Sequence, residues 1–283
     1  MRKVNLITDC TSDLTPELYK KHQIDILPLY VTFGSESYRD GIDITTEQLY
    51  EKVNETKNLP KTAALPPLIF QEAFEKYPAD EDIIFMGLGS DFSVSYSNAV
   101  IIARDFPNVY VIDSQNLSAG IGLQLLKICE FRAQGLSAPE IVEKMSAITP
   151  LVRTQFAIDT LEYLHMGGRC SGTSRFFGTM LRIKPIIRVV NGIMEIAKKP
   201  HGKYIKALNV LLEYFANDAS RVDPFCVVVT HSLAEDDATY LINIIKNEYG
   251  FANVIETRAS GVISTHCGPR TIGILYVLKN EVL

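Results

Sequence analysis

Apolar positions in the first half of the chain fall into short runs rich in β-branched residues, and these runs alternate with longer amphipathic segments. The short runs predict strands at residues 4–8, 26–33, 82–88 and 109–112. The longer segments predict helices at residues 14–22, 45–54, 93–105 and 118–133. Because strands that alternate with helices in this rhythm indicate βαβ units, we predict a mostly parallel sheet.

The second half mixes parallel and antiparallel signals. Strand patterns occur at residues 155–158, 183–190, 193–196, 226–230, 254–258 and 273–278, and helical patterns at 160–165, 204–217 and 236–249. Asn191-Gly192 lies between two of the strand patterns and predicts a hairpin. We therefore predict a two-domain α/β fold. Residues 1–152 form a Rossmann-like domain with helices on both faces of its sheet, residues 153–283 form a mixed-sheet domain, and the ligand lies between them.

Composition narrows the class of protein. The chain has 283 residues, is 47% apolar and carries a net charge of −5, which argues against a broad nucleic-acid-binding surface. Its five cysteines are scattered and form no CxxC pair, so we expect neither a disulfide framework nor a zinc site. Reduced thiols fit a cytoplasmic protein. The N-terminal residues lack an apolar signal core, and no apolar run is long enough to span a membrane.

Three polar stretches carry the candidate chemistry: residues 61–63, 93–96 and 265–269. Each lies where an apolar segment breaks into a turn, and their principal side chains are Thr62, Ser93 and His266. Together they offer hydroxyls and one imidazole to a small anionic group. None carries a complete set of nucleophile, base and acid, a metal cluster or a phosphate cradle. The pattern therefore favours a site that holds a ligand without transforming it.

Each of these residues has a structural alternative. Ser93 precedes a helix that is expected to begin near Ser95, whose N-terminus would favour an anion, but capping that helix is the commoner role of serine. Thr62 lies in a loop stiffened by prolines, or in an ordinary turn. His266 stands between the strand-like pair Val262-Ile263 and Gly268, either as a ligand contact or as a structural hydrogen-bonding group.

Further candidates are weaker. Arg169 follows Gly167-Gly168 and is expected either to hold an anion or, more simply, to form an ion pair with an acidic loop. We expect Asp9 and Asp13 to serve turns and caps and not a metal ion. The secondary candidates for the ligand site are Ser95, Arg169, Cys267, Gly268 and Arg270. Neither the dinucleotide-binding GxGxxG pattern nor the P-loop pattern occurs in the places that those sites require.

With these segments in hand, the chain resembles the DegV family of fatty-acid-binding proteins over essentially its whole length. The motifs that carry the resemblance are Thr8-Asp9-Cys10-Thr11-Ser12-Asp13-Leu14, Pro28-Leu29-Tyr30-Val31, Tyr38-Arg39-Asp40-Gly41, Val111-Ile112-Asp113-Ser114, Leu161-Glu162-Tyr163-Leu164, Gly167-Gly168-Arg169, Ile183-Lys184-Pro185-Ile186 and Thr265-His266-Cys267-Gly268-Pro269. Any one of them is weak evidence, and all of them in this order are specific.

The resemblance implies a lipid-binding protein with no cofactor or metal and no catalytic activity of its own. A fatty acid of roughly 14 to 18 carbons would lie in an apolar tunnel between the domains. Its carboxylate would be held by Thr62 and Ser93, with His266 nearby. Family members that work with a fatty acid kinase carry the lipid while the kinase uses ATP to make an acyl phosphate, which feeds phospholipid synthesis. The expected partners are therefore the fatty acid and such a kinase.

The chain departs from the family pattern at several positions. Ala63 replaces a hydroxyl residue after Thr62, and Asp91 stands near the serine turn. Arg270 replaces the glycine after Gly268-Pro269, so it is a candidate to offset Asp91. The basic stretch around residues 199–206 has lysines and a histidine where an arginine is usual, and in kinase-coupled members that arginine assists docking or phosphate transfer. This departure affects the expected kinase partnership more than lipid binding.

Two other functions compete with lipid carriage. The first is a lipid hydrolase that uses Ser93 or Cys267 as the nucleophile and His266 as the base. It lacks a GxSxG elbow and an identifiable acid to orient the imidazole. The second is a small polar ligand, such as a sugar or a nucleotide, in the same cleft. Few aromatic or amide residues gather at the candidate loops, so this alternative is the least favoured.

Overall fold

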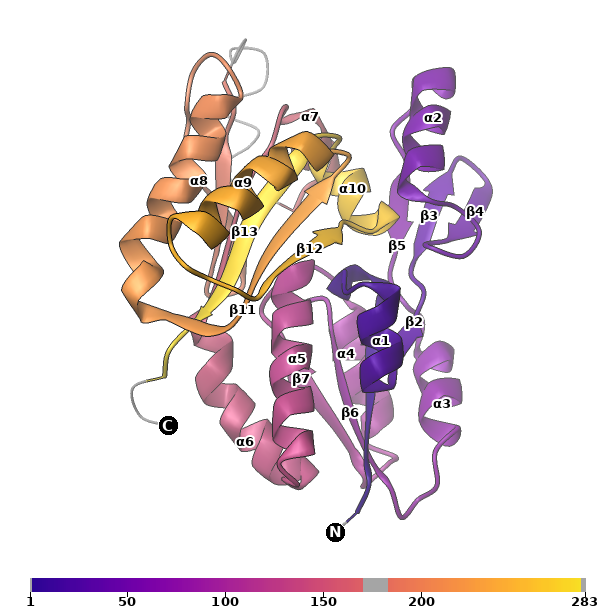
Figure 1. Cartoon of the computed structure of the whole chain (residues 1–283). Coiled ribbons are helices and arrows are strands. Elements are labelled where there is room, and N and C mark those ends of the chain that lie inside the picture. Colours follow the sequence, from indigo (N-terminus) through magenta and orange to yellow (C-terminus); the bar gives the residue numbers. More distant parts are fainter. Residues whose placement is uncertain (1, 170–182, 281–283) are drawn as a thin grey trace.

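The computed structural model of the chain describes residues 2–169 and 183–280, so Cys170 lies outside the described residues. Its N-terminal sheet is parallel throughout, in the order β2-β1-β6-β7 (Figure 1). The strands are β1 (Val4–Asp9), β2 (Ile24–Leu27), β6 (Asp82–Gly87) and β7 (Val109–Asp113). This confirms the parallel sheet predicted from the apolar runs.

Helices cover both faces of this sheet, as predicted. They are α1 (Pro16–His22), α3 (Pro67–Glu75), α4 (Ser95–Ala103), α5 (Ala119–Ala133) and α6 (Ala138–Ile148). Successive strand residues point to opposite faces. Leu6 and Met86 lie in one core with α5 and α6, whereas Ile7 and Phe85 lie in another core with α3 and α4.

The C-terminal sheet is mixed, in the order β10-β9-β8-β13-β11-β12, and only β11 and β12 run parallel. Its strands are β8 (Val152–Ala157), β9 (Ile186–Val190), β10 (Ile193–Lys198), β11 (Val222–Ser232), β12 (Val254–Arg258) and β13 (Thr271–Leu278). The hairpin predicted at Asn191-Gly192 joins β9 to β10. The predicted mixed α/β character of this half is confirmed.

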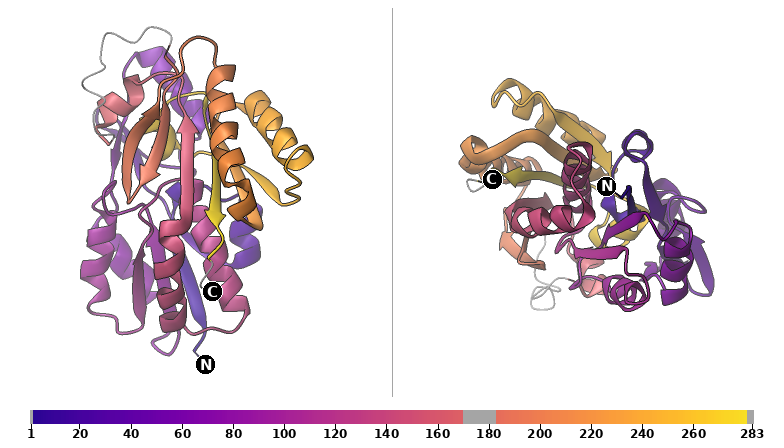
Figure 2. Two further views of the ribbon diagram at one scale, coloured as in Figure 1. Left: turned by 90° about the vertical axis from the view of Figure 1, so that its left-hand side faces the viewer. Right: turned by 90° about the horizontal axis from the view of Figure 1, so that it is seen from below.

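Two helix pairs enclose the C-terminal sheet. Helices α8 (Ile205–Asp218) and α9 (Glu235–Asn247) pack on one face. Helices α5 and α6 pack on the other, where Val228 and Leu275 share a core with the N-terminal sheet. Seen from below, α5 and α6 lie at the junction of the two halves (Figure 2). The division near residue 152 stays a prediction, because this core crosses it.

A small antiparallel sheet, β4-β3-β5, extends the N-terminal half together with α2 (Thr46–Thr56). Its strands are β3 (Tyr30–Phe33), β4 (Glu36–Arg39) and β5 (Lys61–Ala63). The single strand predicted over 26–33 is therefore wrong. The chain leaves the parallel sheet after Leu27 and enters the small sheet at Tyr30, and Pro28 lies in the break because proline cannot donate to a ladder.

Two short helices of the second half pack on the first half. They are α7 (Glu162–Gly167) and α10 (Gly261–Cys267), and their residues Tyr163 and Val262 belong to the core of the small sheet. The strand-like assignment of Val262-Ile263 is therefore wrong. Asp40 accepts the backbone N–H groups of Gly261 at 2.9 Å and Val262 at 2.8 Å, so a distant carboxylate caps this helix.

Short 3-10 helices complete the described elements, at Cys10–Ser12, Thr149–Leu151 and Ala219–Arg221. Across residues 2–169 and 183–280, no helix combines the length and apolar character needed to cross a bilayer.

Candidate functional site

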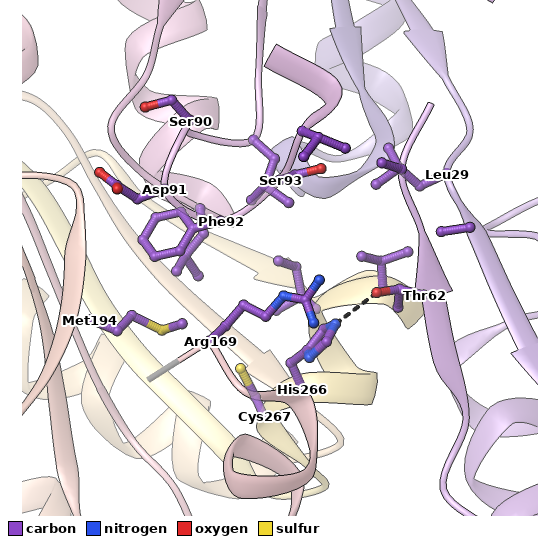
Figure 3. Close-up of a pocket in the computed structure, with 17 residues that line it drawn as sticks. Leu29, Thr62, Ser90, Asp91, Phe92, Ser93, Arg169, Met194, His266 and Cys267 are labelled. Carbon is purple, nitrogen blue, oxygen red and sulfur yellow. Dashed lines mark hydrogen bonds between the residues drawn. The ribbon is translucent and has the colours of Figure 1, made fainter. Parts of the chain in front are cut away.

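A cavity of about 280 Å³ lies beyond the carboxyl ends of β6 and β7, where β5, β10 and α10 meet the loops that follow those strands. Ligands of open α/β sheets bind at this edge. Most of its lining is apolar, and its polar side chains are Thr62, Ser90, Asp91, Ser93, Arg169 and His266. In Figure 3, Thr62, Arg169 and His266 are grouped together, with Ser93 across from them.

Thr62 lies in the middle of β5 and pairs with Val31 of β3, so its prediction as a loop residue is wrong. Its side-chain oxygen is 2.8 Å from Nε2 of His266 (Figure 3). The proline at position 60 pushes the residue before it into extended geometry, which favours entry into a strand. The strand fixes the hydroxyl more firmly than a loop would.

Ser93 contacts the start of α4 and also faces the cavity. Its Oγ accepts the backbone N–H of Ser95 at 3.2 Å, which is a capping contact at the start of α4, and it lines the cavity. Its hydroxyl also donates to Oγ of Ser95 at 3.0 Å. The half-buried position of Ser93 leaves its side chain accessible from the cavity.

Ser95 is buried behind Ser93 and does not line the cavity. Its Oγ accepts the backbone N–H of Leu65 at 3.0 Å, and the side-chain amide of Asn98 donates to the carbonyl oxygen of Leu65 at 2.8 Å. Leu65 follows β5, so α4 holds the segment that carries Thr62. The strand that carries Thr62 and the loop that carries Ser93 are thereby fixed relative to each other. Sequence reasoning missed the role of Asn98, for which there was no local signal.

His266 lies at the C-terminal end of α10. Burial, and then the nearby Arg169 guanidinium, lower the pKa of His266 to about 4, so the imidazole is neutral at neutral pH. Its Nδ1 has no hydrogen-bond partner among the described residues. Within that part of the chain, no carboxylate orients the ring as a hydrolase would require. Cys267, the alternative nucleophile, lines the cavity and is buried.

Arg169 is exposed and lines the cavity beside His266 (Figure 3). Its Nη1 donates to the carbonyl oxygen of Gly167 at 2.7 Å, at the end of α7. The acidic loop partner considered from the sequence is not found, because no carboxylate of the described residues lies within ion-pair distance of the guanidinium. The residue therefore offers a positive charge to the cavity.

Two other candidates lie away from the cavity. Gly268 has φ of +82° and packs against the ring of Tyr163, so it shapes the end of α10. Arg270 forms an ion pair with Asp237 at 2.9 Å and stacks over the ring of Tyr204. It does not line the cavity, so it does not offset Asp91 there. The carboxylate of Asp91 points away from Thr62 and His266 (Figure 3).

The apolar wall was missed by sequence reasoning. Phe92, Leu117, Met194 and Ile263 are all buried, line the cavity and belong to one apolar cluster. They come from four segments far apart in the chain. An apolar residue in such a segment has the same local pattern as any core residue, so no signal in the sequence distinguishes it.

A larger hollow of about 840 Å³ opens between α1 and the loop before α2. Asp13 and Asp40 face it, and burial raises the pKa of Asp13 to about 8. Both carboxylates hold the start of α10, since Asp13 accepts the N–H of Ser260 at 2.9 Å. The cap expected of the Asp9/Asp13 pair is found at Asp9, whose side chain accepts the backbone N–H of Thr11 at the start of the 3-10 helix Cys10–Ser12, whereas Asp13 contacts a residue of a distant helix. We prefer the smaller cavity because Thr62, Ser93 and His266 all line it, whereas none of them lines this hollow.

No group of three or more candidate metal ligands is found among residues 2–169 and 183–280. The sequence profile of the DegV family matches residues 3–279. The chain belongs to the DegV family.

Relatives in this family match the chain over its length. A DegV domain-containing protein of Caldanaerobacter subterraneus is 32% identical, over 99% of this chain and 100% of the relative. A solved DegV family protein of Thermus thermophilus, described as binding fatty acid, superposes with a TM-score of 0.91 at 28% identity, and the match covers 99% of this chain and 100% of that protein. A stearic acid-binding protein of Eubacterium ventriosum has a TM-score of 0.87 at 25% identity, with both chains fully covered.

Proposed function

We propose that this DegV family protein binds a long-chain fatty acid in the 280 Å³ cavity, between residues 1–152 and 153–283. The carboxylate is held by Thr62 and Ser93, with His266 behind Thr62. The observation that carries this proposal is the convergence of two hydroxyls and one neutral imidazole on a cavity that is otherwise mostly apolar. The described binding of fatty acid by the Thermus thermophilus and Eubacterium ventriosum proteins supports it.

The head group is recognised by hydrogen bonds from groups that are already in place. Hydroxyl hydrogens rotate to suit their acceptors. With a carboxylate present, Ser93 turns its hydrogen to the ligand, and Ser95 behind it donates to Ser93 in turn. Arg169 and the N-terminus of α4 supply positive potential without a buried ammonium group. Each hydrogen bond to the charged head contributes about 1.5–3 kcal/mol.

The acyl chain supplies most of the binding energy. Burial is worth ~0.8 kcal/mol for each CH₂, so a chain of about 16 carbons offers on the order of 11 kcal/mol before ordering costs. Phe92, Leu117, Met194 and Ile263 provide the apolar surface that replaces water. We expect ligands of roughly 14 to 18 carbons.

The carrier would present this lipid to a fatty acid kinase. In that step a carboxylate oxygen attacks the terminal phosphorus of ATP, ADP leaves, and an acyl phosphate forms. The half-buried Ser93 and the 64% exposed Val94 support access to the head group from outside. The test combines the loaded protein with ATP and a DegV-coupled kinase, and traps the acyl phosphate with hydroxylamine. Acyl hydroxamate should require both proteins, and no hydroxamate above the kinase-free control would contradict the partnership.

Lipid binding is tested by denaturing the purified protein and analysing its organic extract by mass spectrometry. We expect a fatty acid at roughly one per chain, and an extract that holds only polar metabolites would contradict the proposal. In delipidated protein, Thr62→Ala and Ser93→Ala should each weaken stearate binding by about tenfold or more in calorimetry. Thr32→Ala is the matched control, because Thr32 lies on the neighbouring strand β3 and does not line the cavity.

A further inference from the structure

Helix α7 ends directly against the imidazole of His266. A methyl group at Gly167, built in the ideal Cβ position, would lie 2.2 Å from Nδ1 and 3.1 Å from Cε1 of His266. Contacts this short do not occur in real proteins, so the ring and any larger side chain cannot occupy their places together. A hydrogen on Cα of Gly167 takes this direction and points at Nδ1.

This contact decides which ring nitrogen carries the proton. Nδ1 has no hydrogen-bond partner among the described residues. A proton on Nδ1 would be pressed against the Cα hydrogen of Gly167, whereas the bare lone pair accepts a Cα–H contact with a small gain. The contact with Gly167 therefore favours the neutral ring with its hydrogen on Nε2.

The position of that hydrogen sets the direction of the next hydrogen bond. Nε2 lies 2.8 Å from the side-chain oxygen of Thr62. When Nε2 carries the hydrogen, it donates to Thr62, and the hydroxyl is free to donate to the cavity. In the other tautomer, Nε2 would accept the hydroxyl hydrogen of Thr62. The hydroxyl oxygen of Thr62 would then present only lone pairs to a carboxylate.

We propose that Gly167 is a positioning residue of the ligand site. By leaving room for only a hydrogen atom beside Nδ1, it holds His266 in the Nε2–H tautomer and makes Thr62 a hydrogen-bond donor toward an anionic head group. This inference rests on the proposed fatty acid binding. It adds that the preference of the site for a head group that accepts hydrogen bonds is set by a residue at the end of α7 that does not itself line the cavity.

The test begins with the ligand-free protein, because tautomers are read spectroscopically and not from heavy-atom positions. In protein labelled with ¹⁵N-histidine, long-range ¹H–¹⁵N correlation spectra should show Nε2 of His266 protonated and Nδ1 unprotonated. Gly167→Ala should displace the ring and change this signature. It should also weaken stearate binding by about tenfold, although alanine is the better helix former. Met166→Ala, at a 66% exposed position of α7, should change neither.

A double-mutant cycle separates positioning from general damage. In a His266→Ala background, Gly167→Ala should have no further effect on stearate affinity, since the group that it displaces is gone. A wild-type spectrum with Nδ1 protonated, or a Gly167→Ala protein with unchanged spectrum and affinity, would overturn the inference. An equal loss in both backgrounds would do so as well. Wild-type protein that shows the Nε2–H tautomer but binds no stearate would instead overturn the proposed function.

Discussion

Replacing Ser95 by alanine tests whether α4 holds the strand that carries Thr62 against the loop that carries Ser93. Oγ of Ser95 accepts the backbone N–H of Leu65 at 3.0 Å and the hydroxyl of Ser93 at 3.0 Å. Ser95 is 1% exposed and Leu65 is fully buried, so water cannot replace the lost acceptor. The substitution leaves a buried N–H group unpaired and frees the segment that follows Thr62.

The magnitude follows from these two bonds. An unpaired buried donor costs about 1–3 kcal/mol, and a typical lost hydrogen bond about 0.5–1.5 kcal/mol. We expect the free energy of unfolding to fall by about 2 kcal/mol, which corresponds to a melting temperature lower by roughly 3–4 °C for a chain of this size. Stearate affinity should fall by about tenfold, because Ser93 loses the donor behind it and Thr62 loses its fixed position.

The assay pairs thermal unfolding with stearate calorimetry. Ser137→Ala is the control: it removes the capping box of α6, far from the cavity, and should cost about 1 kcal/mol of stability without changing affinity. A Ser95→Ala protein that binds stearate as tightly as wild type would refute the role of Ser95 in fixing Thr62 and Ser93. So would a loss of affinity in Ser137→Ala of the same size, because the effect would then follow stability alone.

The remaining predictions probe the cavity, the imidazole and α10. Leu117→Trp should fill part of the cavity and weaken stearate binding much more than octanoate binding, and equal effects in calorimetry would contradict the assigned acyl path. Burial lowers the pKa of His266 from 6.5 to about 4, so between these pH values the unfolded chain binds a proton at this imidazole and the folded chain does not. This group therefore makes the free energy of unfolding rise by roughly 2–3 kcal/mol as the pH increases across that window. Urea denaturation of His266→Asn at pH 5 and pH 7 should show a smaller difference than wild type; an unchanged difference would count against a buried neutral ring. Asp40→Ala should leave the N–H groups of Gly261 and Val262 without their acceptor, although the Ser260 cap of α10 remains. It should lower the free energy of unfolding by about 2 kcal/mol and weaken stearate binding, and a normal melting temperature would contradict this role of Asp40.

Much of the architecture could be predicted from the sequence because its signals are local. Apolar runs such as residues 82–88 have the length and composition of buried parallel strands, and Asn191-Gly192 specifies a hairpin within two residues. The errors arose where a distant partner decides the local structure. Val262-Ile263 is β-branched, yet it is helical, and Asp40, more than 200 positions earlier in the chain, accepts the first two N–H groups of α10 in addition to the local cap from Ser260.

The site was predictable to a similar degree. Thr62, Ser93 and His266 were selected from turns and from family resemblance, and they line one cavity. The apolar wall could not be predicted, because Leu117 and Met194 meet only through the packing of two sheets. Arg270 was selected for its charge, but that charge is paired with Asp237, and a single sequence gives no sign of that pairing.

The central claim is tested most directly by a crystal structure of the protein with stearate. We predict one stearate in the 280 Å³ cavity, with its carboxylate oxygens about 2.5–3.0 Å from the side-chain oxygens of Thr62 and Ser93 and its chain against Phe92 and Ile263. A lipid bound with its carboxylate away from both hydroxyls, or a lipid in the larger hollow beside Asp40, would contradict the account.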